Sequence, residues 1–275
     1  MWDLAGGVAV VTGAGSGIGR ELAKQLAREK MSLALADVNE TTLRETLSQI
    51  GNAGAPVSTH VLNVADPKQV EQFAADVLAR HKRVSLLINN AGVALHGTFE
   101  ELSIADLEWL MGINFWGMIY GVKNFLPALK REPRSRIVNL SSIFGIISPA
   151  GQTAYCASKF AVRGFTEALR QEMTLAGHRV GVTAVHPGYV KTAIARNAGA
   201  AEGVDIAAGI KVFDKVAITS AHRAARTILK AVRKNKARVV VGLDARAFDL
   251  VVRVFPSGYQ RLLGPMTARF QPPAR

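Results

Sequence analysis

The chain has 275 residues, of which 49% are apolar and 20% charged, so it can bury a core and is not an intrinsically disordered protein. Its longest apolar runs have the length of strands, which leaves no candidate transmembrane helix. The single cysteine, Cys156, excludes an internal disulfide, and six scattered histidines show no metal-ligand spacing, so we expect no metal. The N-terminus has an acid where a signal peptide needs basic residues, which predicts a cytoplasmic protein.

The first element is a buried strand over residues 7–12, followed by a glycine-rich turn and a helix that runs to about residue 30. Glycines let a backbone approach a pyrophosphate, and the free N–H groups of a helix N-terminus favour its negative charge. An ordinary tight turn is the alternative, but the flanking strand and helix favour a phosphate-binding site. Its candidate residues are Gly13, Ser16, Gly17, Ile18 and Gly19.

The second strand, residues 32–36, ends in Asp37. A carboxylate at this position accepts hydrogen bonds from the adenosine ribose of NAD and repels the 2′-phosphate of NADP. Neither Ser16 nor Val38 supplies the cation that a 2′-phosphate requires. The sequence therefore favours NAD over NADP.

Helices and strands then alternate, with helices from about residues 40 and 67 and strands at 57–64 and 84–89. This alternation predicts a Rossmann-type α/β fold, a doubly wound parallel sheet with helices on both faces. Ligands of such sheets bind beyond the carboxyl ends of the strands. The third strand places there an amide side chain that could contact the adenine edge. The fourth strand ends in a turn of small residues, although a plain strand-exit turn fits that turn nearly as well. The candidate residues of the two turns are Asn63, Val64, Asn90, Ala91 and Gly92.

A long helix over residues 105–131 carries Asn114, a poor residue for a helix interior that suggests a specific polar contact. After a strand at 136–140 comes Ser142, and a helix at 154–177 carries Tyr155 and Lys159 four residues apart, on one face. An ammonium beside a phenol lowers the phenol's pKa and lets it act as a general base. A surface Tyr and Lys pair is the alternative for this spacing alone.

A further buried strand at residues 181–185 leads into a turn at 186–192 that reaches the same ligand edge. Residues 193–215 are rich in Ala and Gly and are expected to form a mobile cover over the site, or an ordinary surface loop. A basic helix at about 220–236 and a strand at 238–241 follow. No linker divides the chain, so we predict one catalytic domain, residues 1–243, and a basic C-terminal extension, 244–275.

Taken together, these motifs resemble the short-chain dehydrogenase/reductase family over about the first 245 residues. The matching residues are Thr12, Gly13, Gly17, Gly19, Asp37, Asn89 to Gly92, Asn114, Ser142, Tyr155, Lys159, Pro187 and Gly188. Each motif is moderately specific, but their common order and spacing are very specific. Asn63 departs from the family, which commonly has Asp at the adenine contact.

The resemblance implies a role for each matching residue. Tyr155 would be the catalytic acid and base, Ser142 would hold the substrate oxygen, and Lys159 would lower the Tyr155 pKa and bind the nicotinamide ribose. Asn114 would anchor a water in a proton relay. Pro187 and Gly188 belong to the cofactor loop, in which Val190 and Thr192 would meet the nicotinamide carboxamide.

We therefore interpret the chain as an NAD-dependent oxidoreductase that interconverts a hydrophobic, secondary alcohol and a ketone. The apolar residues expected on the substrate side are Leu95, Ile143, Phe144, Ile146 and Tyr189. One alternative is a ketoacyl reductase that acts on an acyl carrier, and another is a nucleotide-sensing binding protein without catalysis. Nucleic-acid binding is favoured only by the charge and is not expected.

The net charge of +13 lies mostly at the end of the chain, where residues 219–275 hold 12 Lys and Arg against 2 Asp and Glu. Apolar residues at helical spacing predict two short amphipathic helices, one at 244–255 and one that includes Tyr259, Leu262, Leu263 and Met266. We expect this extension to border the substrate pocket, with weak contact to an anionic membrane as a second role. The resemblance also implies a homodimer or homotetramer packed through the two long helices.

Overall fold

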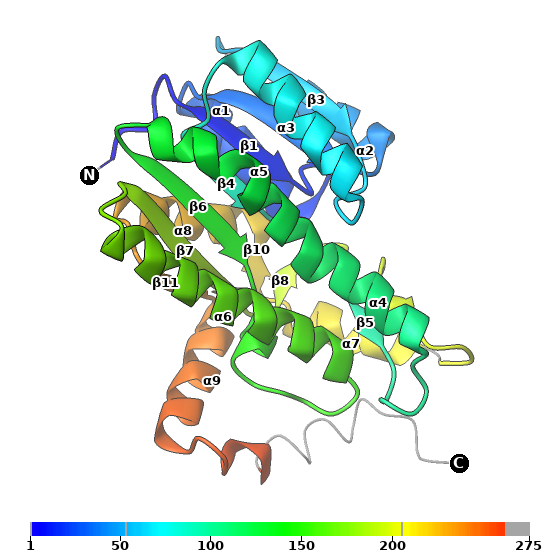
Figure 1. Ribbon diagram of the computed structural model, residues 1–275. Coiled ribbons are helices and arrows are strands. Elements are labelled where there is room, and N and C mark those ends of the chain that lie inside the picture. Colours follow the sequence, from blue (N-terminus) through cyan, green and yellow to red (C-terminus); the bar gives the residue numbers. More distant parts are fainter. Residues whose placement is uncertain (1, 53, 205, 262–275) are drawn as a thin grey trace.

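A computed structural model describes residues 2–52, 54–204 and 206–261 and shows one seven-stranded parallel sheet (Figure 1). The strand order is β11-β7-β6-β4-β1-β2-β3, so the order reverses between β1 and β4. Because every strand is parallel, all seven carboxyl ends meet at one edge of the sheet. The strands are β1 (Val8–Thr12), β2 (Ser32–Asp37), β3 (Val57–Val61), β4 (Leu86–Asn89), β6 (Ser135–Leu140), β7 (Val180–Pro187) and β11 (Arg238–Val241).

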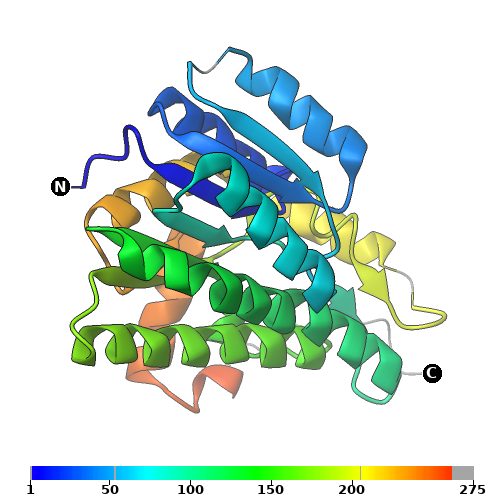
Figure 2. The same ribbon diagram turned by 45° about the horizontal axis from the view of Figure 1, so that its top comes forward.

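Helices cover both faces of the sheet, as the two ribbon views show (Figures 1 and 2). One face carries α1 (Gly17–Arg28), α2 (Glu40–Ile50) and α8 (Ala221–Arg233), and the other carries α3 (Pro67–His81), α5 (Gly117–Arg131) and α6 (Thr153–Leu175). The predicted doubly wound α/β fold is confirmed. Among the described residues, no helix is long and apolar enough to cross a membrane.

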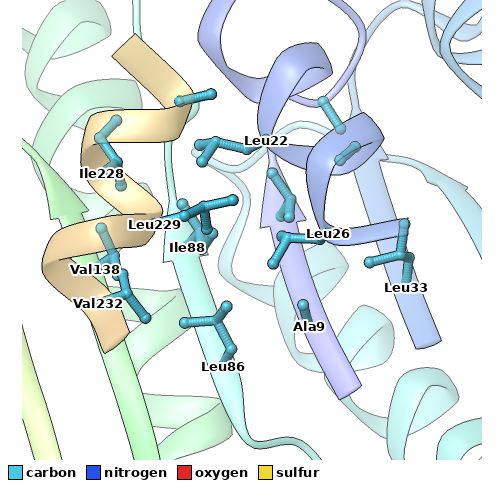
Figure 3. Packing of buried hydrophobic residues seen from close by; sticks show 14 of the residues in the cluster. Ala9, Leu22, Leu26, Leu33, Leu86, Ile88, Val138, Ile228, Leu229 and Val232 are labelled. Atoms are coloured by element: carbon cyan, nitrogen blue, oxygen red, sulfur yellow. The ribbon is translucent and has the colours of Figure 1, made fainter. Parts of the chain in front are cut away.

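The core shows why these helices dock where they do. Leu22 and Leu26 of α1 and Ile228 and Leu229 of α8 belong to one buried cluster with side chains of the central strands, and Leu22 lies beside Leu229 (Figure 3). Each of these four side chains is at most 2% exposed, and burying a residue of this size contributes about 1.5–3 kcal/mol. The spacing of apolar residues at i, i+3 and i+4 in α1 and α8 therefore fixes their contact with the sheet.

Two predicted elements change in the structure. The strand expected at residues 57–64 ends at Val61, because Asn63 and Asp66 form a turn that caps α3. The helix expected over residues 105–131 consists of α4 (Ile104–Met111), a π-helical turn (Gly112–Trp116) and α5. A π-helical turn adds one residue to the helical repeat and is frequent at functional sites.

The cover predicted over residues 193–215 contains a helix that the sequence did not indicate, α7 (Ala207–Val216). Two short pairs of parallel strands attach this region to the rest of the domain. β5 (Leu95–His96) pairs with β9 (Gly199–Ala200), and β8 (Val190–Lys191) pairs with β10 (Thr219–Ser220). These pairs join segments about a hundred and about thirty residues apart in the chain, which local sequence patterns do not reveal.

The extension begins with α9 (Leu243–Val254), which leaves the sheet edge at the lower left of Figure 1. Its buried side chains, with Tyr259, pack on Ile143, Ile146 and Ile147, so the predicted apolar face lies on the protein's own core. The second predicted helix falls largely outside the described residues, as do Leu262, Leu263 and Met266.

Candidate active site

One large cavity of about 1500 Å³ lies along the carboxyl edge of the sheet. Its lining includes nearly every candidate residue of the sequence, from both the nucleotide side and the catalytic side. Only Gly19 and Asn114 are absent from the lining and lie behind it. The lining candidates are Gly13, Ser16, Gly17, Ile18, Asp37, Asn63, Val64, Asn90, Ala91, Gly92, Ser142, Tyr155, Lys159, Pro187, Gly188, Val190 and Thr192.

The glycine turn after β1 has a shape that only glycine allows at several positions. Gly13 and Gly17 have φ values of +63° and +52°, in the region that disfavours other residues. A Cβ at Gly13 would lie 2.8 Å from the Ala91 backbone, and one at Gly19 would overlap the Gly13 carbonyl. The turn therefore presents bare backbone to the cavity ahead of α1, a cradle that fits the pyrophosphate of a dinucleotide.

Asp37 closes this cradle on the adenosine side. Its Oδ2 accepts from the Gly15 N–H at 2.8 Å and its Oδ1 from the Asn39 N–H at 3.0 Å. Arg20, which the sequence motifs did not single out, also reaches this turn. Its guanidinium donates to the Gly15 carbonyl and pairs with Glu45, and it does not line the cavity. Asp37 is thus the charged group that a bound ribose would meet.

Asn90 joins the two strands at which the sheet order reverses. Its Nδ2 donates to the carbonyls of Thr12 and Gly13, at 2.9 and 3.0 Å. The N–H groups of Asn90 and Ala91 both donate to Thr12 Oγ1 at 3.1 Å. These bonds hold the turn after β4 against the glycine turn, so that residues of both turns line the cavity side by side.

Asn63 and Val64 line the cavity in the turn after β3. Asn63 Oδ1 accepts from the Ala65 N–H at 3.0 Å, so this oxygen already has a structural role in the turn. The predicted adenine contact through this oxygen would share it with that turn.

Three side chains from β6 and α6 meet at the centre of the cavity. Ser142 follows β6 and opens a 3₁₀ turn (Ile143–Gly145), and its hydroxyl acts on the Tyr155 phenol by lowering the pKa of that group. Lys159 lies one helical turn after Tyr155, with its Nζ 5.5 Å from the centre of the Tyr155 ring. The Nζ donates to the Leu140 carbonyl at 3.2 Å. The structure thus brings the predicted catalytic trio together.

The electrostatics of the trio differ from the expectation that Lys159 lowers the Tyr155 pKa. Burial raises the pKa of Tyr155 to about 12, and the Ser142 hydrogen bond offsets only part of that rise. Burial likewise lowers the pKa of Lys159 to about 8. A charge is costly in a dry site for either group, and desolvation is the largest influence on both pKa values.

Asn114 supports the trio from behind, in the π-helical turn. Its side chain is buried and bonds the Val93 backbone twice, accepting from the N–H at 2.8 Å and donating to the carbonyl at 3.0 Å. It also donates to Ser158 Oγ, which in turn donates to the Tyr155 carbonyl. The polar contact expected of Asn114 therefore ties α6 to the turn after β4.

The substrate side is built from aromatic rings in sequence-distant segments. Tyr189 contacts Phe213 of α7 at 5.8 Å and Phe144 at 6.2 Å between ring centres, and Phe144 contacts Tyr155 at 6.0 Å. Ile143, Phe144 and Tyr189 line the cavity as expected. Leu95 and Ile146 do not, because they pack into the small cores under β5 and α9.

Two residues near the site were missed in the sequence. His186 is fully buried at the end of β7, with Nδ1 3.0 Å from the Ser142 carbonyl and its pKa lowered to about 4 by burial. Asp244 of α9 accepts from the Tyr189 N–H at 2.7 Å. His186 adjoins the Pro187–Gly188 pair, which was a usable signal, whereas no local pattern marks Asp244.

The family model for the short chain dehydrogenases matches residues 7–203. The chain belongs to the short-chain dehydrogenase/reductase family. A Mycobacterium tuberculosis protein that carries the name oxidoreductase SadH is 46% identical over 276 residues, covering all of both chains. The family assignment makes this protein a short-chain oxidoreductase.

Solved structures of short-chain dehydrogenases/reductases have the same architecture. A member from Burkholderia phymatum in complex with NAD superposes with a TM-score of 0.85 at 30% identity, covering 100% of both chains. A short chain dehydrogenase from Mycobacterium paratuberculosis bound to NAD has a TM-score of 0.75 at 24% identity. The match covers 87% of this chain and 97% of that chain.

Proposed function

We propose that this short-chain dehydrogenase/reductase interconverts a neutral, hydrophobic secondary alcohol and its ketone with NAD as the cofactor. The observation that carries the proposal is the trio at the cavity centre, where the Ser142 hydroxyl lowers the pKa of the Tyr155 phenol and Lys159 Nζ lies 5.5 Å from the centre of its ring. A binding protein that only senses a nucleotide has no need of a phenol, a hydroxyl and an ammonium buried together, so the trio favours catalysis.

Bound NAD supplies the redox chemistry by accepting or giving a hydride. In oxidation Tyr155 takes the hydroxyl proton of the alcohol, and in reduction it gives that proton to the ketone oxygen. Ser142 holds the same oxygen through its hydroxyl. Because the Tyr155 pKa is about 12, the phenolate needs the Lys159 ammonium beside it while it exists.

Asp37 supports NAD rather than NADP. Its carboxylate faces the cavity where a ribose would lie, while the guanidinium of Arg20 is turned to Gly15 and Glu45. A 2′-phosphate at about 4 Å from a carboxylate would cost about 4 kcal/mol at an effective dielectric constant of 20. The related Burkholderia phymatum structure, which is 30% identical, contains NAD.

The charges around the substrate half favour a neutral substrate. Glu100, Glu101 and Glu202 line this part of the cavity, and Lys159 is the only Lys or Arg among the described lining residues. An acyl carrier or another acidic substrate would meet repulsion at the entrance. This observation weighs against the ketoacyl reductase alternative, and the rings of Phe144, Tyr189 and Phe213 favour an apolar substrate body.

The test is a screen of the purified protein with NAD against apolar secondary alcohols and with NADH against their ketones, following absorbance at the NADH wavelength. Turnover should be largest for neutral apolar compounds and should fall when a carboxylate is added to the same carbon frame. Faster turnover of a ketoacyl thioester than of any neutral ketone would contradict the proposal.

For partners, we infer a homodimer or homotetramer packed through α5 and α6, and weak contact of α9 with an anionic membrane. Trp116, the last residue of the π-helical turn before α5, is 48% exposed, and Phe160 of α6 is 39% exposed. Outward on α9, Leu243, Leu250 and Val254 are 58–72% exposed. Their spacing of seven and four places them on one stripe, beside Arg246 and Arg253.

An apolar stripe beside cations is suited to an anionic lipid surface. Sedimentation with vesicles of anionic or of neutral lipid at low salt measures this contact, and Leu250→Glu should reduce it. Equal sedimentation of the wild type and Leu250→Glu with anionic vesicles would contradict it. The mass in solution, compared between the wild type and Trp116→Glu, tests the oligomer independently.

A further inference from the structure

The loop that follows β7 connects the cofactor side of the cavity with the C-terminal extension. Pro187, Gly188, Val190 and Thr192 of this loop line the cavity. On its far side the Gly188 N–H donates to the Val241 carbonyl of β11 at 2.8 Å. The next N–H, that of Tyr189, donates to a side chain of the extension, Asp244 Oδ2, at 2.7 Å.

The surroundings of Asp244 are shaped to admit its carboxylate. A Cβ at Gly188 would overlap Asp244 Oδ2, and a Cβ at Gly242 would overlap Oδ1. Gly242 also has a φ of +105°, which other residues rarely adopt. Two glycines from different segments, β7–β8 and β11–α9, thus leave room for one side chain.

The carboxylate is costly to hold there, which argues for a role. Its Oδ1 is buried and has no hydrogen-bond partner within the described residues, and an unpaired buried polar atom costs free energy. The position in the first turn of α9, where the helix dipole favours negative charge, offsets part of that cost. The hydrogen bond from the Tyr189 N–H is the interaction that is gained for the rest of this free-energy cost.

The helix that carries Asp244 is itself firmly attached. Asp249 pairs with Arg238 of β11 at 2.8 Å, and the apolar side of α9 packs on the segment that follows Ser142. Because α9 is held in place, the hydrogen bond from the Tyr189 N–H to Asp244 also holds the loop in place. The Tyr189 ring in turn contacts Phe144, which contacts Tyr155, and Phe213 of the cover helix α7.

We infer that Asp244 is a positioning residue through which the C-terminal extension holds loop 187–192 in the shape that receives the nicotinamide half of the cofactor. The inference rests on the proposed NAD-dependent function. It gives the extension a role in the active site although, in the part of it that the structure describes, no residue lines the cavity.

The experiment compares the binding of NADH and of ADP-ribose, which lacks the nicotinamide, to the wild type, Asp244→Ala, Asp244→Asn and Asp249→Ala. Calorimetry measures both dissociation constants, and thermal unfolding measures stability. Asp244→Ala should weaken NADH binding about tenfold, the effect of one lost hydrogen bond to a charged group. ADP-ribose binding should fall by less, because ADP-ribose lacks the nicotinamide that the loop is proposed to receive.

Asp249→Ala is the matched control, since it removes a carboxylate from the same helix without touching the loop. It should lower the unfolding temperature and weaken NADH binding by less than Asp244→Ala, because the packing of α9 on the segment after Ser142 still holds the helix in place. Asp244→Asn keeps an oxygen acceptor of the same shape, so it should fold even if the alanine variant does not, and should weaken NADH binding by less than Asp244→Ala.

Equal NADH affinity of the wild type and both Asp244 variants would overturn the inference alone. Parallel losses of NADH and ADP-ribose affinity would also overturn it, because a general structural defect produces that pattern. A wild type that binds ADP-ribose but not NADH, or neither ligand, would instead overturn the proposed function on which the inference rests.

Discussion

The two halves of the cavity are built in different ways. The nucleotide half consists of short turns that directly follow β1, β2 and β4, and its shape depends on bonds to the backbone, such as those from Ala14 N–H to the Ala36 carbonyl and from Asn90 Nδ2 to the Gly13 carbonyl. The substrate half is assembled from the turn after β6, the loop after β7 and α7, which meet through side chains such as Phe144, Tyr189 and Phe213.

This difference teaches where changes are tolerated. A turn fixed by glycines and backbone hydrogen bonds has little freedom to accept another side chain, because a Cβ at Gly13 or Gly19 meets backbone. A wall of packed side chains can exchange them for others of similar volume. We therefore expect substitutions in the first half to affect the cofactor and those in the second half to affect the substrate.

The largest effect is expected at the boundary between the halves. Tyr155→Phe removes the proton carrier and keeps the ring, so kcat should fall by about 10²–10⁴ while NADH binding remains. Steady-state rates and calorimetric NADH affinity measure the two outcomes. Tyr120→Phe, which does not line the cavity, is the matched control, and turnover by Tyr155→Phe near the wild-type rate would refute the mechanism.

A charge exchange confined to the nucleotide half should change cofactor choice alone. Asp37→Ser with Val38→Arg removes a carboxylate and adds a cation beside the ribose, so the ratio of kcat/KM for NAD to that for NADP should fall at least about a hundredfold. Val38→Arg by itself separates the two contributions. Equal use of both cofactors by the wild type would show that Asp37 does not select.

The pH dependence tests whether the trio titrates as one unit. Below the Lys159 pKa of about 8, Tyr155 and Lys159 are both protonated. The pair must lose one proton before it can hold a phenolate beside an ammonium. Alcohol oxidation should therefore rise about tenfold per pH unit up to about pH 8 and then level off. Ketone reduction needs both protons, so it should be constant below about pH 8 and fall above it.

Profiles of kcat between pH 6 and 10 in both directions provide the measurement. Lys159→Ala should abolish the change near pH 8, because the remaining phenol titrates at about 12. The same change at pH 8 in this variant would assign it to another group.

The smallest effect is expected in the substrate half. Phe213→Ala removes a ring from the cover, so KM for an apolar substrate should rise about tenfold, the scale of a few lost methylene contacts. NADH affinity should not change. Phe99→Ala, at a ring that is 64% exposed and does not line the cavity, is the control. A loss of NADH affinity in Phe213→Ala would show that the two halves are not separable.

The sequence by itself determined the fold and the nucleotide half. Strand periods, helix periods and the glycine turn are local patterns, and a parallel sheet brings the ends of its strands together whatever the side chains are. The positions of Gly13, Asp37, Asn90 and Ser142 at one edge of the sheet therefore follow from the order of the strands along the chain. Tyr155 and Lys159 followed from the repeat of a single helix.

The tertiary structure alone decided how α7 closes the substrate half, the electrostatics of the trio and the role of the extension. The Tyr155 pKa depends on how much water the surrounding segments exclude, and the sequence expectation counted the neighbouring ammonium but not this desolvation, which raises the pKa. Asp244 contacts Tyr189 across 55 residues. A periodic pattern cannot encode such a pairing, because it arises only when two separately folded segments pack side by side.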